Sequence, residues 1–150
     1  MNIQGKRYIL TKVIKGVTGG FMPAVPTRIV ILDIDDHTVT ISQQLQSDSE
    51  NAVEGYLSTT ATVSIDSIKP LVEEISNNLK TLPIEEPRGA EDIYGYDTSI
   101  IIESPGFRWQ NTPNQGCNVQ ISKTQPTSNQ RELFKSIVDK LYLLVDQHLK

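Results

Sequence analysis

The sequence predicts an α+β fold, a two-layer sandwich in which two amphipathic helices lie on one face of an antiparallel sheet of about five to six strands. Short segments rich in β-branched and aromatic residues follow one another through short or medium turns, which favours antiparallel pairing. Two further segments carry apolar residues at helical spacing, and such stripes need a common apolar surface to cover them.

The first half of the chain is predicted to be strands and turns. Residues 7–15 have strand composition, and residues 28–42 are interpreted as a hairpin around the Asp-Asp turn at 35–36. Residues 43–55 lose the alternation and are mostly polar, which indicates an exposed loop. Residues 57–65 return to strand composition.

The first helix is predicted over residues 66–79, where apolar residues recur every three or four positions. Either Asp66 or Ser67 is expected to cap it, and Pro70 is tolerable because it falls in the first turn. Pro83 prevents the helix from continuing.

The second half of the chain returns to strands before the final helix. Residues 84–95 and 104–116 contain prolines, glycines and charges and are predicted to be loops. Residues 96–103 are a predicted strand, and residues 117–122 alternate cleanly enough to predict the last one.

The closing segment, residues 126–150, is the most clearly marked helix. Thr127 and Gln130 have the spacing of a capping box, which marks its start. Its apolar residues form one broad stripe: Leu133, Phe134, Ile137, Val138, Leu141, Leu144 and Val145.

Length and composition bound the class of protein. The 150 residues suffice for one domain that includes the polar loop 43–55. The net charge of -4 argues against nucleic acid as a partner, and the single cysteine excludes an internal disulfide. The first residues lack an apolar signal-peptide core, and no run approaches the roughly 20 apolar residues of a membrane span. We therefore expect a soluble, cytoplasmic protein without membrane association.

No catalytic or metal-binding constellation stands out. Nucleophilic catalysis could draw on Cys117, His37 and His148, but nothing in the sequence brings these residues together. Residues 33–37 are the one local acidic cluster, and they lack the glycine and terminal glutamate of a calcium loop. The sequence thus predicts a solvated turn at 33–37, with no catalytic residue, metal or cofactor.

Two loops carry more apolar side chains than a solvated turn needs, and each has two interpretations. The loop at 16–26 either folds back on the core or is an exposed contact loop. In the loop at 104–116, Trp and Arg suit an interface hot spot; alternatively both rings fill the edge of the core while the arginine points outward. The candidate binding residues are Gly19, Gly20, Phe21, Met22, Phe107, Arg108 and Trp109.

Several short motifs, in their order along the chain, resemble the emfourin family. They are Gly19-Gly20-Phe21, Leu82-Pro83, Tyr94-Gly95-Tyr96-Asp97, and Pro126 before the helix at 133–149. Emfourins are small bacterial inhibitors of thermolysin-like zinc proteases, built from an antiparallel sheet that carries two helices. The resemblance implies an inhibitor that blocks a protease by surface contact. The chain is longer than the family and adds the polar loop 43–55 and the loop around Trp109.

The sequence therefore predicts a non-enzymatic protein-binding domain, with a thermolysin-like metalloprotease as the partner that the resemblance implies. Two alternatives stay open. One is a small-molecule or peptide-binding domain that uses the uncovered face of the sheet, and the other is an enzyme that uses Cys117. The oligomeric state is not determined by any of these patterns.

Overall fold

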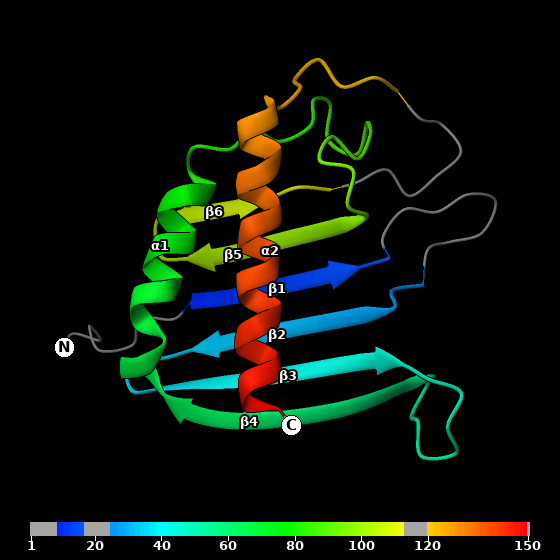
Figure 1. The fold of residues 1–150 in the computed structure, drawn as a ribbon, viewed down its shortest axis with the longest axis vertical. Helices are drawn as coiled ribbons and strands as arrows, with labels where there is room; N and C mark the ends of the chain where they lie inside the picture. The colour runs from blue at the N-terminus through cyan, green and yellow to red at the C-terminus, as the bar shows by residue number, and fades with distance from the viewer. Residues whose placement is uncertain (1–8, 17–24, 113–119, 150) are drawn as a thin grey trace.

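The computed structural model describes residues 9–16, 25–112 and 120–149 (Figure 1). Its elements are β1 (Ile9–Lys15), β2 (Arg28–Ile34), β3 (Thr38–Gln46), β4 (Tyr56–Ser64), the 3-10 helix η2 (Ile65–Ser67), α1 (Lys69–Leu79), β5 (Thr98–Ser104), β6 (Phe107–Gln110) and α2 (Ser128–His148). The strands form one sheet in the order β4-β3-β2-β1-β5-β6, and every neighbouring pair is antiparallel.

The predicted α+β class is confirmed. β1 to β4 are neighbours in chain order, and α1 then carries the chain back across the sheet, so that β5 pairs with the other side of β1. Figure 1 shows α1 and α2 on the same face, crossing the strands in opposite directions. One layer of helices on one layer of sheet therefore leaves the second face without a helix in the part of the chain that the structure describes.

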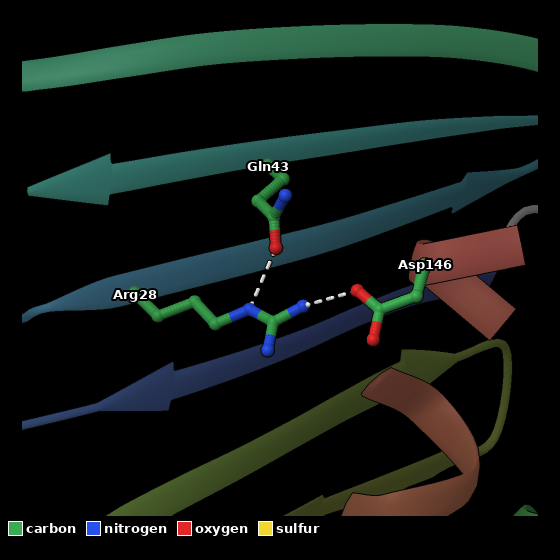
Figure 2. Close-up of polar contacts among 3 residues, drawn as sticks. All are labelled: Arg28, Gln43 and Asp146. Atoms are coloured by element: carbon green, nitrogen blue, oxygen red, sulfur yellow. Dashed lines mark hydrogen bonds and ion pairs between the residues drawn. The ribbon is translucent and has the colours of Figure 1, made fainter. Parts of the chain in front are cut away.

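The predicted hairpin around residues 35–36 is present as β2 and β3. The Asp35 carboxylate accepts hydrogen bonds from the backbone N–H groups of His37 and Thr38, which closes the turn. β3 continues to Gln46, so the loop predicted from residue 43 begins later. Gln43 is buried and accepts a hydrogen bond from Arg28 (Figure 2), and its polar side chain concealed the alternation of a strand.

The start of the first helix differs from the prediction. Ser64, rather than Asp66 or Ser67, provides the side-chain cap, and it caps η2 by accepting a bond from the Asp66 N–H. α1 begins at Lys69 with no side-chain cap of its own, and Pro70 stands in its first turn as predicted. The side-chain cap that was predicted for α1 is thus found one turn earlier, on the short 3-10 helix that precedes it.

α2 confirms the predicted capping box and apolar stripe. Thr127 Oγ1 accepts a bond from the Gln130 N–H at 3.1 Å, and the Gln130 side chain accepts one from the Thr127 N–H at 2.9 Å. Near the other end of α2, Arg28 of β2 pairs with Asp146 at 3.1 Å (Figure 2). The Arg28 guanidinium also lies 4.0 Å over the Tyr142 ring. α2 is therefore capped at its start and tied to the sheet near its end.

The core lies between the helices and the sheet. Phe134 of α2 is fully buried at its centre, and its ring stacks on Tyr94 with centroids 4.2 Å apart. Apolar residues from the sheet and both helices surround it, including Val13, Val30, Leu32, Ile41, Leu79, Ile100, Ile102, Ile137 and Leu141.

The last strand lies elsewhere than predicted. β6 occupies residues 107–110, inside a predicted loop, because a two-residue turn with Gly106 at φ 79° folds the chain straight back from β5. Residues 120–122, the described part of the predicted strand, form no strand. Their backbone instead bonds to the loop before β5, as in the bond from Gln120 N–H to Ala90 C=O.

Candidate functional site

Trp109, a predicted binding residue, belongs to the core. Its side of β6 faces the helices, and only 8% of its surface is exposed. The indole Nε1–H donates to the Leu82 carbonyl at 3.1 Å, and the ring lies 6.5 Å from Phe134. The ring therefore packs the end of the sheet against the segment after α1 and presents little surface to a partner.

Phe107 and Arg108 lie on opposite sides of β6. Phe107 is half-buried on the helix side, where the Lys80 ammonium stands 5.0 Å from its ring. Arg108 is exposed on the other side and pairs with Glu103 of β5 at 3.3 Å. It also donates to Gln110 at 2.7 Å. The second interpretation of this segment, rings against the core and arginine outward, describes its geometry.

Four other predicted binding residues lie outside the described residues: Gly19, Gly20, Phe21 and Met22. Cys117, on which the enzyme alternative depends, lies outside them as well. The two histidines are far apart in the fold, since His37 stands in the β2–β3 turn and His148 ends α2.

The acidic turn at 33–37 has a structural role. The N–H groups of Thr38 and His37 donate to the Asp35 carboxylate, and these bonds hold its pKa below the ordinary value. Across residues 9–16, 25–112 and 120–149, no three His, Cys, Asp or Glu side chains are grouped so that they could hold a metal ion. The turn is therefore explained by its own backbone hydrogen bonds.

A buried carboxylate that the sequence did not reveal orders the loop at 84–95. Glu85 is 2% exposed and accepts bonds from the N–H groups of Gly89, at 2.9 Å, and Thr112, at 3.0 Å. Burial raises the pKa of the nearby Tyr94 phenol, and the Glu85 charge raises it further. The Tyr94 hydroxyl donates to the Pro83 carbonyl. These groups satisfy one another and hold the loop against the core.

The sheet face opposite the helices carries an apolar band, and we call this side the open face. Alternate residues of β1, β2 and β5 are buried under the helices, so the residues between them point to the open face. Among the described residues, no helix or strand lies over it (Figure 1). The apolar band consists of the half-buried residues Leu10, Ile14, Ile29, Ile31 and Ile101.

Polar residues border the band on both sides. On one side Arg108 and Glu103 form the ion pair of β6 and β5. Lys12 stands within the band, opposite Ile31 of β2 and Ile101 of β5. Hydroxyl-bearing side chains of β3 and β4 border the other side: Thr40, Ser42, Thr60 and Thr62. An apolar centre with a polar rim is the usual composition of a protein-binding surface.

A shallow hollow of about 270 Å³ lies towards the β4 side. This volume is slightly below the roughly 300–1,000 Å³ of ordinary small-molecule pockets, and six of the eight lining residues carry polar side chains. The residues around the hollow are Ile29, Ile31, Ser42, Gln43, Gln44, Ser58, Thr59 and Thr60. The hollow is thus small and open to solvent, which suits a protein partner better than an enclosed ligand.

The sequence of β2 carries one signal of the open face. A sheet with one solvated face should alternate apolar and polar residues, whereas Ile29 to Leu32 are apolar without interruption. Such a run indicates a strand that is apolar on both faces.

No family model matches the chain, and no curated protein matches it. None of the helices in the described parts of the chain is long and apolar enough to cross a membrane. The open face is therefore interpreted from its own geometry.

Proposed function

We propose that the protein is a non-enzymatic protein-binding domain that binds its partner with the open face of the sheet. The apolar band carries this proposal, because a one-sided α+β sandwich has no structural need for five aliphatic side chains on its solvated face. Covering them with a partner removes apolar surface from water, which contributes roughly 25 cal/mol per Å² before the costs of association.

The charges on the open face can set the orientation of a bound partner. Lys12 lies within the band, and the Arg108–Glu103 pair lies at its β6 border. Asp33 of β2 lies on the same face beside Leu10. Charges of both signs around an apolar centre favour a partner whose surface places opposite charges at these positions, which sets orientation more than affinity.

The partner that we propose is a thermolysin-like zinc protease, inhibited by surface contact. The resemblance of the short motifs to emfourin supports this choice, and so does the sheet with two helices on one face. The small volume of the hollow, about 270 Å³, weighs against the small-molecule alternative.

The direct test measures inhibition of thermolysin with a peptide substrate, together with binding of thermolysin to the immobilised protein. We expect inhibition by the wild type and its loss in Ile31→Asp, because a carboxylate in the apolar band must be desolvated in the complex. Leu143→Asp is the matched control, since Leu143 is 57% exposed on α2, in the helix layer.

The result separates the partner from the surface. Absence of both inhibition and binding by the wild type would exclude this protease as the partner. Equal inhibition by wild type and Ile31→Asp, with both folded by circular dichroism, would exclude the open face as the binding surface.

A further inference from the structure

The outer edge of β4 is long and unprotected. β4 spans nine residues, Tyr56–Ser64, with β3 on one side, and no strand among residues 9–16, 25–112 and 120–149 lies on the other. Its register with β3 is continuous, so no bulge bends the strand away from a neighbour. The strand contains no charged residue and no proline. These are the devices by which proteins ordinarily prevent an edge strand from pairing with another chain.

The unpaired backbone groups of this edge can be assigned from the hydrogen bonds to β3. At the end of the ladder, the Ile65 N–H donates to the His37 carbonyl at 3.0 Å, so the odd-numbered residues of β4 face β3. Hydrogen-bonded and non-hydrogen-bonded pairs alternate along antiparallel strands. The outward N–H and C=O groups therefore belong to Ser58, Thr60 and Thr62.

The start of the edge is closed by the chain itself. Val53 and Tyr56 exchange two backbone hydrogen bonds, of 2.8 and 3.0 Å, on the outer side of β4. Glu54 and Gly55 between them both have positive φ, as a tight two-residue turn requires. The free edge consequently runs from Ser58 to Ser64, and its midpoint is Ala61.

The opposite edge of the sheet differs in length and in charge. β6 has only four residues, Phe107–Gln110, and carries the charged Arg108. The Asn111 side chain bonds to the Ile100 N–H and the Thr98 carbonyl, and so continues the β5 pairing where the strand ends. Of these two described edges, only that of β4 is thus both long and free of charge.

We propose that the free edge of β4 pairs with β4 of a second copy of this chain, antiparallel about a two-fold axis at Ala61, so that the two sheets become one. This register sets hydroxyl against hydroxyl on the open face, with Thr60 opposite Thr62 of the second copy. On the helix side it sets Thr59 opposite Val63. Each hydrogen-bonded pair then exchanges two backbone bonds.

Charge selects a second copy as the occupant. In a two-fold contact about Ala61, a formal charge near the middle of β4 would lie close to the same charge of the second copy, across the axis. β4 has none, although 21% of the chain is charged. A strand that pairs with itself must avoid such repulsion, whereas pairing with a different partner would permit complementary charges.

Sedimentation velocity across micromolar concentrations tests this contact, with Thr60→Pro as the main variant. Proline lacks the N–H that points to the second copy and leaves the backbone bonds between β3 and β4 intact, because the Thr60 N–H does not donate to β3. We expect a wild-type dimer whose dissociation constant rises about tenfold or more in Thr60→Pro. Thr60→Val, which keeps the N–H, should remain dimeric.

A second measurement covers the case in which Thr60→Pro folds poorly. Thr62→Lys leaves every backbone group in place and puts like charges across the axis, so it should also favour the monomer. In wild type, exchange of the Ser58, Thr60 and Thr62 amides with deuterium should slow as protein concentration rises. A wild-type monomer at every concentration, or a dimer unchanged by both variants, overturns the proposal. Ile31→Asp should leave the dimer intact, which separates this contact from the open face.

Discussion

At the scale of single residues, Arg28 joins the sheet to α2 through its contacts with Asp146 and Tyr142. Its guanidinium donates to Gln43 at 2.6 Å and pairs with Asp146 at 3.1 Å (Figure 2). The guanidinium also lies over the Tyr142 ring. Gln43 is buried, so removal of Arg28 leaves its carbonyl oxygen without this donor. Asp146 is 65% exposed, and its ion pair contributes little.

We predict unequal effects of mutating the two ends of this contact. Arg28→Ala should lower the free energy of unfolding by about 1–3 kcal/mol, chiefly through the unsatisfied Gln43 oxygen and the lost ring contact. Asp146→Ala should lower it by less than about 1 kcal/mol. Urea denaturation of both variants measures the difference. Equal losses would mean that the ion pair, and not the Gln43 bond or the ring contact, accounts for the stabilisation by Arg28.

Tyr94 makes the fold sensitive to alkaline pH. Burial, and then the Glu85 charge, raise the pKa of its phenol above the unfolded value of about 10. The neutral phenol therefore stabilises the fold fully below pH ~10, and this contribution is lost as pH rises from there through the higher folded pKa. We predict that unfolding free energy falls less steeply above pH ~10 in Tyr94→Phe than in wild type.

Burial also raises the pKa of Tyr142, while Arg28 opposes the shift, so part of the alkaline loss should remain in Tyr94→Phe. Chemical denaturation at a series of pH values measures both slopes. Identical slopes in wild type and Tyr94→Phe would contradict the assignment to Tyr94.

At the scale of elements, the two helices begin in different ways, and this predicts where stability can be lost. α2 has a complete capping box, whereas α1 follows η2 without a side-chain cap. Thr127→Ala should destabilise the protein by about 1 kcal/mol, because the Gln130 N–H loses its ordered acceptor, Thr127 Oγ1. Thr127→Ser keeps the hydroxyl and should be nearly neutral. Thermal denaturation of both variants decides whether the cap contributes.

The elements that the sequence predicted are those whose signals are local. The stripe and cap of α2 are each made of residues close together in the sequence, and so is the turn at Asp35. The structure has all of these features. β6 was missed because four residues are too few for alternation to be read, and its pairing depends on the Gly106 turn. Residues 120–122 alternate in the sequence, yet Ile121 is 85% exposed and the Gln120 N–H bonds to the Ala90 carbonyl of another loop, a long-range contact that periodicity does not reveal.

At the scale of the whole molecule, the candidate site depends on which face the helices cover. The sequence showed that both helices need one surface, but their common side is fixed only when β5 is inserted beside β1. Once that side is known, the pattern of β2 assigns Val30 and Leu32 to the core, and Ile29 and Ile31 to the open face. Binding by Trp109 was predicted from residue type, whereas its burial depends on the position of β6.

Neighbouring residues of β2 allow the two faces to be compared with one kind of substitution. Leu32 is 1% exposed beneath the helices, and Leu32→Thr should cost about 3 kcal/mol or more because it leaves a cavity and buries a hydroxyl. Ile31→Thr keeps the β-branch on the half-buried open face and should cost only about 1 kcal/mol. Denaturant midpoints of the purified variants measure the gap between them. Equal losses would show that the open face is packed like a core in the isolated protein, and a surface already packed in this way could not bind a partner.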